Sequence, residues 1–191
     1  MLDEQVQNAL NAQIEMEARS SHFYLAMASW AENQGLNGTA EFLYRHSDEE
    51  RMHMLKLIRF VNERGGRAAI PALDTPQSDF DDLHSIFSTL LAHENKVTAS
   101  INEIVGLCLS RRDYTTHNFM QWYVAEQIEE EALARNILDK LGLIGKDSGG
   151  LYHFDRDLGQ LDPEARFTSC SCNLHRYGSP CYAAERLCSA S

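Results

Sequence analysis

Apolar residues recur at alternating three- and four-residue steps along four long segments of the chain, a spacing typical of helices with one face in a core. These segments cover residues 3–34, 38–64, 81–109 and 114–141, and a shorter apolar pattern covers 150–161. None of the four prolines falls inside the four long segments. The pattern therefore predicts an all-α protein with four long helices and a short fifth helix.

The lengths of the connections predict how these helices are arranged. About three residues separate the first two helices and about four separate the third and fourth, so each pair should form an antiparallel hairpin. A helix of about 27 residues is roughly 40 Å long. The linker Arg67–Phe80 between the two pairs can extend over roughly 46–50 Å. The sequence therefore predicts a four-helix bundle with one long crossover that runs the length of the bundle.

Each of the four apolar stripes carries a carboxylate near its midpoint. These carboxylates lie about 12–16 residues from the predicted helix starts, roughly 18–24 Å along each axis, so they are expected at one level of the bundle. Burying several carboxylates together is costly, because like charges at close range cannot all ionise. No lysine or arginine occupies the stripes, so metal cations are expected to neutralise the cluster. Its members are Glu17, Glu50, Glu94 and Glu130.

Two spacings in the sequence indicate which metals this cluster suits. Glu50-x-x-His53 places a carboxylate and an imidazole on one helical face, where both can bind one ion. The equivalent positions in the fourth helix are Gln127-x-x-Glu130, in which an amide replaces the first carboxylate. Carboxylate oxygens with imidazole suit iron, manganese or zinc rather than a soft thiolate-bound metal.

These residues give the chain a resemblance to a known family. The segments Phe42–His53 and Asn118–Glu131, together with Glu17, Tyr24 and Glu94, resemble those of the bacterial non-haem ferritins, which are ferritin-like di-iron carboxylate proteins. The similarity extends from residue 1 to about residue 161. It implies a ferritin-like four-helix bundle, in agreement with the helices that the apolar pattern predicts.

The resemblance also implies a di-iron ferroxidase centre inside each subunit. Glu17, Glu50 and His53 are expected to hold the first iron, with Glu50 bridging to the second. Glu94 and Glu130 are expected to complete the second iron site.

Further residues are assigned supporting roles through the resemblance. Gln127 is expected beside the metals as a hydrogen-bonding group, and Tyr24 is placed to donate an electron or a hydrogen bond. Family members often have a third iron site, and its ligands are expected at Glu49, Glu126 and Glu129.

The implied function is iron storage and detoxification. Two Fe(II) ions would be oxidised by O2 or H2O2, and the Fe(III) product would mineralise inside a hollow homo-oligomeric shell of 24 subunits.

Three alternatives are a haem-containing bacterioferritin, a rubrerythrin-like peroxidase and a shell subunit with little or no ferroxidase activity. A haem-binding relative would have methionine where Arg51 stands and histidine where Glu130 stands, so no haem is expected. A rubrerythrin-like protein would bring a pair of Cys-x-x-Cys motifs, which the sequence lacks.

Composition narrows the possible partners and location. The formal net charge of −11 argues against nucleic-acid binding, since phosphates would be repelled. No apolar run approaches the roughly 18 residues that a membrane span needs. The acidic, polar start of the chain does not resemble a secretory signal, so a cytoplasmic location is expected.

Some residues fall outside the main pattern. We interpret His46 as a core or surface histidine rather than a ligand, and Cys108 as a small buried apolar residue. Residues 1–162 are assigned to the bundle, and 163–191 to a tail that departs from the family. The tail is expected to be poorly ordered, although a soft-metal site or disulfides are alternatives for its cysteines, Cys170, Cys172, Cys181 and Cys188.

Overall fold

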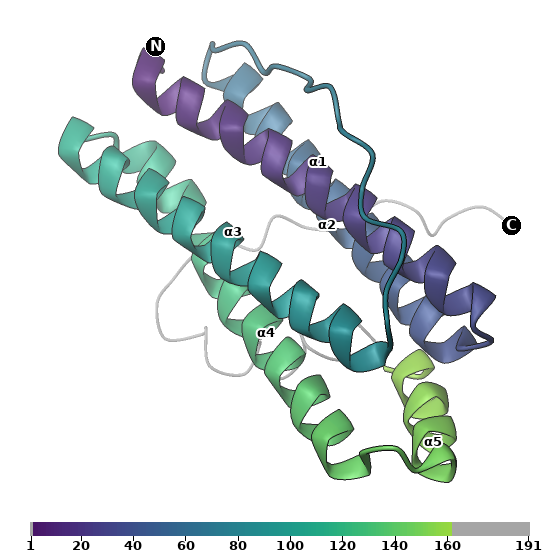
Figure 1. The fold of residues 1–191 in the computed structure, drawn as a ribbon. Coiled ribbons are helices and arrows are strands. Elements are labelled where there is room, and N and C mark those ends of the chain that lie inside the picture. The colour runs from purple at the N-terminus through teal and green to yellow at the C-terminus, as the bar shows by residue number, and fades with distance from the viewer. Residues whose placement is uncertain (1, 162–191) are drawn as a thin grey trace, which may run out of the picture. The chain divides into compact units, whose positions relative to one another are not determined.

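The computed structural model describes residues 2–161, which form five helices and no strand (Figure 1). The helices are α1 (Glu4–Asn33), α2 (Asn37–Glu63), α3 (Leu83–Arg111), α4 (Tyr114–Ile144) and α5 (Ser148–Gly159). This architecture confirms the predicted all-α bundle with a short fifth helix. The predicted tail, 163–191, lies outside the described residues. Within 2–161, every helix is too short or too polar to cross a membrane.

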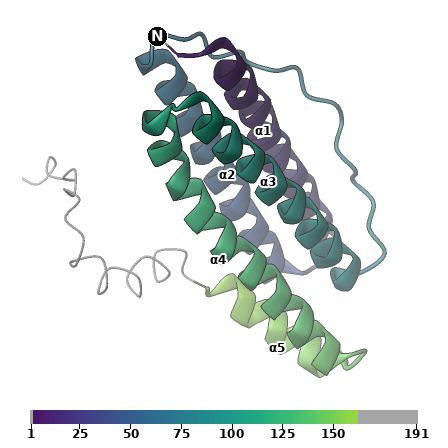
Figure 2. The same cartoon turned by 90° about the vertical axis from the view of Figure 1, so that its left-hand side faces the viewer.

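The four long helices pack as two antiparallel hairpins. α1 packs along α2, α3 packs along α4, and α1 also contacts α3. The chain leaves the end of α2 and returns along the full length of the bundle before α3 begins, so α2 and α3 run in the same direction (Figures 1 and 2). The long crossover that the linker length predicted is therefore present.

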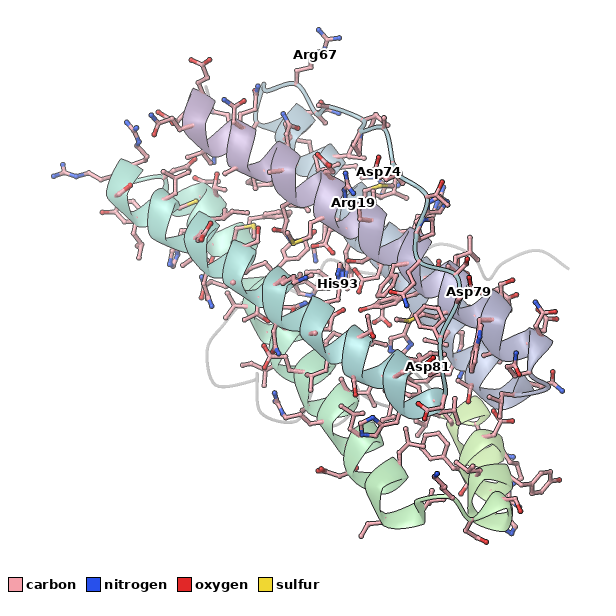
Figure 3. All side chains as sticks on the ribbon, viewed as in Figure 1. Arg19, Arg67, Asp74, Asp79, Asp81 and His93 are labelled. Carbon is pink, nitrogen blue, oxygen red and sulfur yellow. The ribbon has the colours of Figure 1, made fainter. Side chains whose placement is uncertain are left out.

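The crossover lies along α1 and is attached to it by polar and aromatic contacts. The Asn11 side chain accepts from Ala69 N at 2.9 Å and donates to the carbonyl of Arg67 at 3.2 Å. Further along, Arg19 forms an ion pair with Asp74 at 3.1 Å, as Figure 3 shows. These contacts hold an extended segment against the bundle without secondary structure of its own.

The bundle interior consists of two apolar cores with a polar layer between them. One core contains the C-terminal part of α1 and the N-terminal parts of α2 and α3, together with residues from α4 and α5. The other contains the opposite ends of the four long helices. Each long helix passes from one core to the other, and the buried residues at the four crossing points are Glu17, Glu50, Glu94 and Glu130.

Aspartate side chains begin most of the helices. Their carboxylates accept hydrogen bonds from backbone N–H groups in the first turn, which satisfies donors that have no partner within the helix. In α3 the arrangement is a reciprocal capping box with Ser85. The capping residues are Asp3, Asp82, Asp113 and Asp147.

Helix bounds differ from the sequence-based expectation by up to three residues. The fourth helix was predicted to end at 141, before Gly142, but α4 continues to Ile144. It ends at Gly145, whose φ of 60° suits glycine, whereas Gly142 lies inside the helix. The third helix begins at Leu83 rather than 81, because Asp82 is its cap.

The start of α2 is capped by α5 rather than by its own sequence. The N-cap residue, Leu36, has no side-chain cap, and the Asp155 carboxylate accepts from Gly38 N at 3.1 Å and Thr39 N at 2.7 Å. A Cβ at Gly38 would lie 1.8 Å from the Asp155 carbonyl oxygen, so only glycine permits this approach. α5 is therefore fixed to the N-terminus of α2, where a negative charge is favourable.

Replacing Asp155 with alanine should destabilise the bundle, because it removes the cap of α2. The expected cost is about 1–2 kcal/mol, which corresponds to about 2–4 °C in the thermal midpoint for each kcal/mol in a chain of this size. Thermal unfolding followed by far-UV circular dichroism measures it. Asp157→Ala is the matched control, since Asp157 is exposed and pairs with exposed Arg156. Equal midpoints for the two variants would contradict the capping role.

Candidate metal centre

The polar layer between the two cores brings the four predicted carboxylates together. Their relative exposures are 1% for Glu17, 3% for Glu50, 1% for Glu94 and 4% for Glu130. Each comes from a different long helix, and each follows the core-facing spacing of its helix. This burial excludes an arrangement in which the four side chains point into solvent.

One compact ligand group of the layer lies between α1 and α2. Glu17, Glu50 and His53 each offer a ligand atom, and these atoms lie within 4.8 Å of one another. His53 Nδ1 is 3.6 Å from Glu50 Oε2, as the three-residue spacing on one helical face predicts. Two carboxylates and an imidazole at this separation can surround one cation.

Glu17 is oriented by a hydrogen-bonded chain that crosses from α3. Ser100 Oγ donates to Gln13 Oε1 at 2.6 Å, and Gln13 Nε2 donates to Glu17 Oε1 at 2.9 Å. The second carboxylate oxygen, Oε2, is buried and has no hydrogen-bond partner within the described chain. A buried carboxyl oxygen without a hydrogen-bond partner is costly, so this atom fits the ligand of a cation.

Glu94 is held by groups from α1 and α4. The Tyr24 hydroxyl donates a hydrogen bond to Glu94 Oε1. Thr98 has a single hydroxyl hydrogen, which it donates to Glu131 Oε1 at 2.7 Å. The Gln127 amide therefore presents its NH2 group to Thr98 Oγ1 at 2.9 Å, and also to Glu94 Oε2 at 3.3 Å. Gln127 thus lies beside Glu94 as a donor.

A second tyrosine fixes α4 to α2 at the same level. The Tyr123 hydroxyl donates to the backbone oxygen of His53 at 2.9 Å. The Trp122 ring also packs edge-on to the His53 imidazole, with centroids 5.1 Å apart. These contacts limit the rotation of the imidazole and keep it directed toward the carboxylates.

The buried carboxyl groups of the layer are stable only when bound protons or metal cations neutralise their charges. Burial raises the pKa of Glu17 well above its usual value, and the charge of Glu50 adds to that effect. Burial raises the pKa of Glu50 to about 8, with a further contribution from Glu130. Burial, reinforced by Glu17, also raises the pKa of Glu94 to about 8. Near neutral pH these carboxyls retain protons until a metal displaces them.

The residues predicted for a third iron site are only partly brought together. Glu49 and Glu126 offer ligand atoms within 4.8 Å of each other and of His53. Glu126 is buried and Glu49 is half-buried, whereas Glu129 is exposed and belongs to none of the described ligand groups. Burial raises the pKa of Glu126, and Glu129 is nevertheless close enough for its charge to add to that effect, so the third site stays a prediction.

Two residues at the centre were not recognised from the sequence. Gln13 orients Glu17 from one helical turn away, and the four-residue spacing is the signal that could have indicated it. His46, interpreted as a core or surface histidine, lies with Glu49 and Glu130 in a second compact ligand group. The signal there is the spacing His46-x-x-Glu49, which matches that of Glu50-x-x-His53 in reverse order.

Comparisons with known proteins agree with this geometry. A family model described as a ferritin-like domain matches residues 7–144. A probable bacterial non-haem ferritin-like protein of Haemophilus influenzae is 45% identical over 165 residues, which are 86% of this chain and all of that protein. A bacterial non-haem ferritin of Campylobacter jejuni is 42% identical, over 82% of this chain and 93% of that protein. An open-pore ferritin structure from Archaeoglobus fulgidus superposes with a TM-score of 0.83 at 41% identity, covering 85% of this chain and all of that one.

The raised pKa values predict an unusual pH dependence for the metal-free protein. The folded state holds protons on Glu50 and Glu94 up to about pH 8, whereas the unfolded chain releases them near 4.5. Because the folded state binds more protons in this window, the free energy of unfolding should fall as pH rises from about 4.5 to 8.

Thermal unfolding of the chelator-treated protein across this pH range measures the effect, with Glu50→Gln as the comparison. The variant carries no ionisable group at this position, so its midpoint should change less with pH than that of the natural protein. Identical slopes for the two proteins would contradict the proton-holding role of Glu50.

Proposed function

This chain belongs to the ferritin-like family, and we propose that it stores iron as a bacterial non-haem ferritin whose buried centre oxidises Fe(II) to Fe(III). The observation that carries the proposal is the meeting of four buried glutamates and His53 at one level of the bundle. The buried Glu17 Oε2, which no hydrogen-bond donor reaches in the described chain, supports a cation at that level.

In this proposal iron is the substrate, and two ions bind side by side. Glu17, Glu50 and His53 hold the first, and Glu50 bridges to the second, which Glu94 and Glu130 complete. The four carboxylates carry four negative charges and so offset two divalent ions without buried excess charge. The hard oxygen ligands suit iron in both oxidation states.

The oxidation step balances with the oxidants that the family resemblance implies. Two Fe(II) ions each lose one electron, and O2 takes up both electrons and two protons to give H2O2. With H2O2 as the oxidant, the same two electrons and two protons give two water molecules. The two Fe(III) products carry six positive charges against four carboxylates. The excess charge favours hydrolysis and departure toward the mineral.

Protein groups around the centre have positioning roles. Gln13 keeps Glu17 turned toward the metals, and the Gln127 amide supports Glu94. The Tyr24 hydroxyl donates to Glu94, which also places the phenol where it can supply an electron. Such outer contacts orient ligands and tune how strongly they bind.

Assembly completes the proposed function. A hollow homo-oligomeric shell of 24 subunits, in the cytoplasm, would hold the Fe(III) mineral away from other reactions. We expect the purified protein to contain no haem, because Arg51 follows Glu50 where a haem-binding relative has methionine. A Soret band in the absorption spectrum would contradict this part of the proposal.

Replacing Glu50 with glutamine should lower the initial rate of Fe(II) oxidation at least 10-fold, because it removes the bridging carboxylate. Stopped-flow absorbance after mixing Fe(II) with the metal-free protein in air measures this rate. Glu103→Gln is the matched control, since Glu103 is an exposed acid on α3. If the natural protein oxidises Fe(II) no faster than buffer, a shell subunit without ferroxidase activity is the correct interpretation.

Replacing Tyr24 with phenylalanine should weaken the second iron site by about 10- to 100-fold, because Glu94 loses one of its two donors and keeps only the Gln127 amide. Anaerobic Fe(II) titration by calorimetry measures the two binding constants separately. The first site should keep its affinity, since its ligands do not contact Tyr24. Unchanged affinity at both sites would leave electron donation as the only role open to Tyr24.

A further inference from the structure

Thr98, on α3, connects the buried layer with an ion pair on the surface of α4. Its hydroxyl oxygen lies 2.9 Å from the side-chain amide of Gln127 and 2.7 Å from Glu131 Oε1. Arg135, one turn further along α4, donates to Glu131 Oε2 at 2.8 Å. The Glu131 side chain is 21% exposed and that of Arg135 is 52% exposed, whereas Gln127 is buried. Hydrogen bonds therefore run without a break from the surface of α4 to the amide beside Glu94.

Packing does not determine which way the Gln127 amide faces. An amide turned by 180° occupies nearly the same space, so its surroundings distinguish the NH2 group from the oxygen only through hydrogen bonds. A cavity of about 250 Å³ between α3 and α4 also borders Gln127, Thr98 and Glu131, so this side of the amide is loosely packed. The partners of the amide are therefore what fixes its orientation.

Glu131 determines that orientation through Thr98. A threonine hydroxyl has one hydrogen, and a carboxylate paired with arginine can only accept. The Thr98 hydrogen therefore lies on the contact with Glu131, and the Thr98 oxygen is left as an acceptor. The Gln127 amide turns its NH2 group to this acceptor. The same NH2 group then lies 3.3 Å from Glu94 Oε2 and 3.2 Å from the Glu94 backbone oxygen.

The opposite orientation would place the amide oxygen against Glu94. Two oxygens that face each other without a hydrogen between them repel, so an ionised Glu94 would turn away from its present position. In the orientation that Thr98 selects, Glu94 Oε2 faces a donor, and the Tyr24 hydroxyl donates to Oε1. Both oxygens of Glu94 are thus held from two directions before any metal binds.

We propose that Thr98 and Glu131 are positioning residues for the second iron, because through the Gln127 amide they hold the Glu94 carboxylate in the orientation that binds this ion. The inference rests on the proposed function, which assigns Glu94 to the second iron. Thr98 and Glu131 act through Gln127 and are not ligands themselves, and Arg135 contributes by fixing Glu131. Loss of a group that orients a metal ligand lowers the affinity for the metal by about 10- to 100-fold.

Neutron diffraction from crystals of the perdeuterated, metal-free full chain tests the orientation directly, because deuterium positions distinguish an amide nitrogen from an oxygen. The deuterated amide nitrogen of Gln127 should face Thr98. The hydroxyl deuterium of Thr98 should point to Glu131 Oε1. An amide oxygen facing Thr98, or a Thr98 deuterium that points to Gln127, would overturn the inference.

Thr98→Val measures the effect on metal binding, since valine keeps the shape of threonine and removes the hydroxyl without changing the charge. In an anaerobic calorimetric titration with Fe(II), the second binding constant should fall about 10-fold while the first stays unchanged. Thr98→Ser keeps a hydroxyl and should restore the second constant. Thr89→Val is the matched control on the same helix, because the Thr89 hydroxyl donates to the carbonyl of Ser85 within α3.

A double variant shows whether Thr98 acts through Gln127. Gln127→Leu has no amide to orient, so adding Thr98→Val to it should change the second binding constant by less than about 2-fold. A loss of the same size in both backgrounds would mean that Thr98 acts by another route, and it would overturn the inference.

The titrations also separate this inference from the proposed function. Unchanged binding constants in Thr98→Val would overturn the inference, and two Fe(II) ions bound by the natural protein would then leave the proposed function standing. A natural protein that does not bind two Fe(II) ions would contradict the proposed function and the inference together.

Discussion

Repulsion among buried carboxylates is the constraint on which this structure depends. Glu17, Glu50, Glu94 and Glu130 occupy one layer between two apolar cores, each contributed by a separate helix. The cores hold the helices at fixed positions, so the carboxylates cannot separate without unpacking the bundle. Their charges must therefore be offset where they stand, by protons or by cations. The same constraint links the stability of the bundle to the metal that it binds.

Side chains around the layer determine how the buried carboxyl groups are oriented. Tyr24 and Gln127 donate to Glu94, and Gln13 donates to Glu17, so individual carboxylate oxygens are oriented before any metal arrives. Glu17 Oε2, by contrast, is buried without a hydrogen-bond partner in the described chain. A preoriented set of anionic oxygens lowers the cost of arranging ligands when a cation binds.

Much of the fold was predictable because it follows from periodicity and length. The apolar stripes determined the helices, and the reach of the linker determined the crossover. The level at which the carboxylates meet followed from the helical rise alone. The cap that Asp155 supplies to α2 was not predictable, because it joins residues that are far apart in the sequence. The ligand group of His46 was missed because its third member, Glu130, lies on another helix, and the spacing His46-x-x-Glu49 alone does not indicate it. The exposure of Glu129 was likewise hidden by the run of acids that contains it.

The central claim is that divalent ions replace protons among the buried carboxyls. Its most direct test is the number of protons released when Fe(II) is added anaerobically to the metal-free protein near neutral pH, measured at constant pH by titration with base. Because Glu50 and Glu94 keep their protons up to about pH 8 in the metal-free state, more than one proton should be released for each pair of ions bound. Binding of two ions without any proton release would contradict the account.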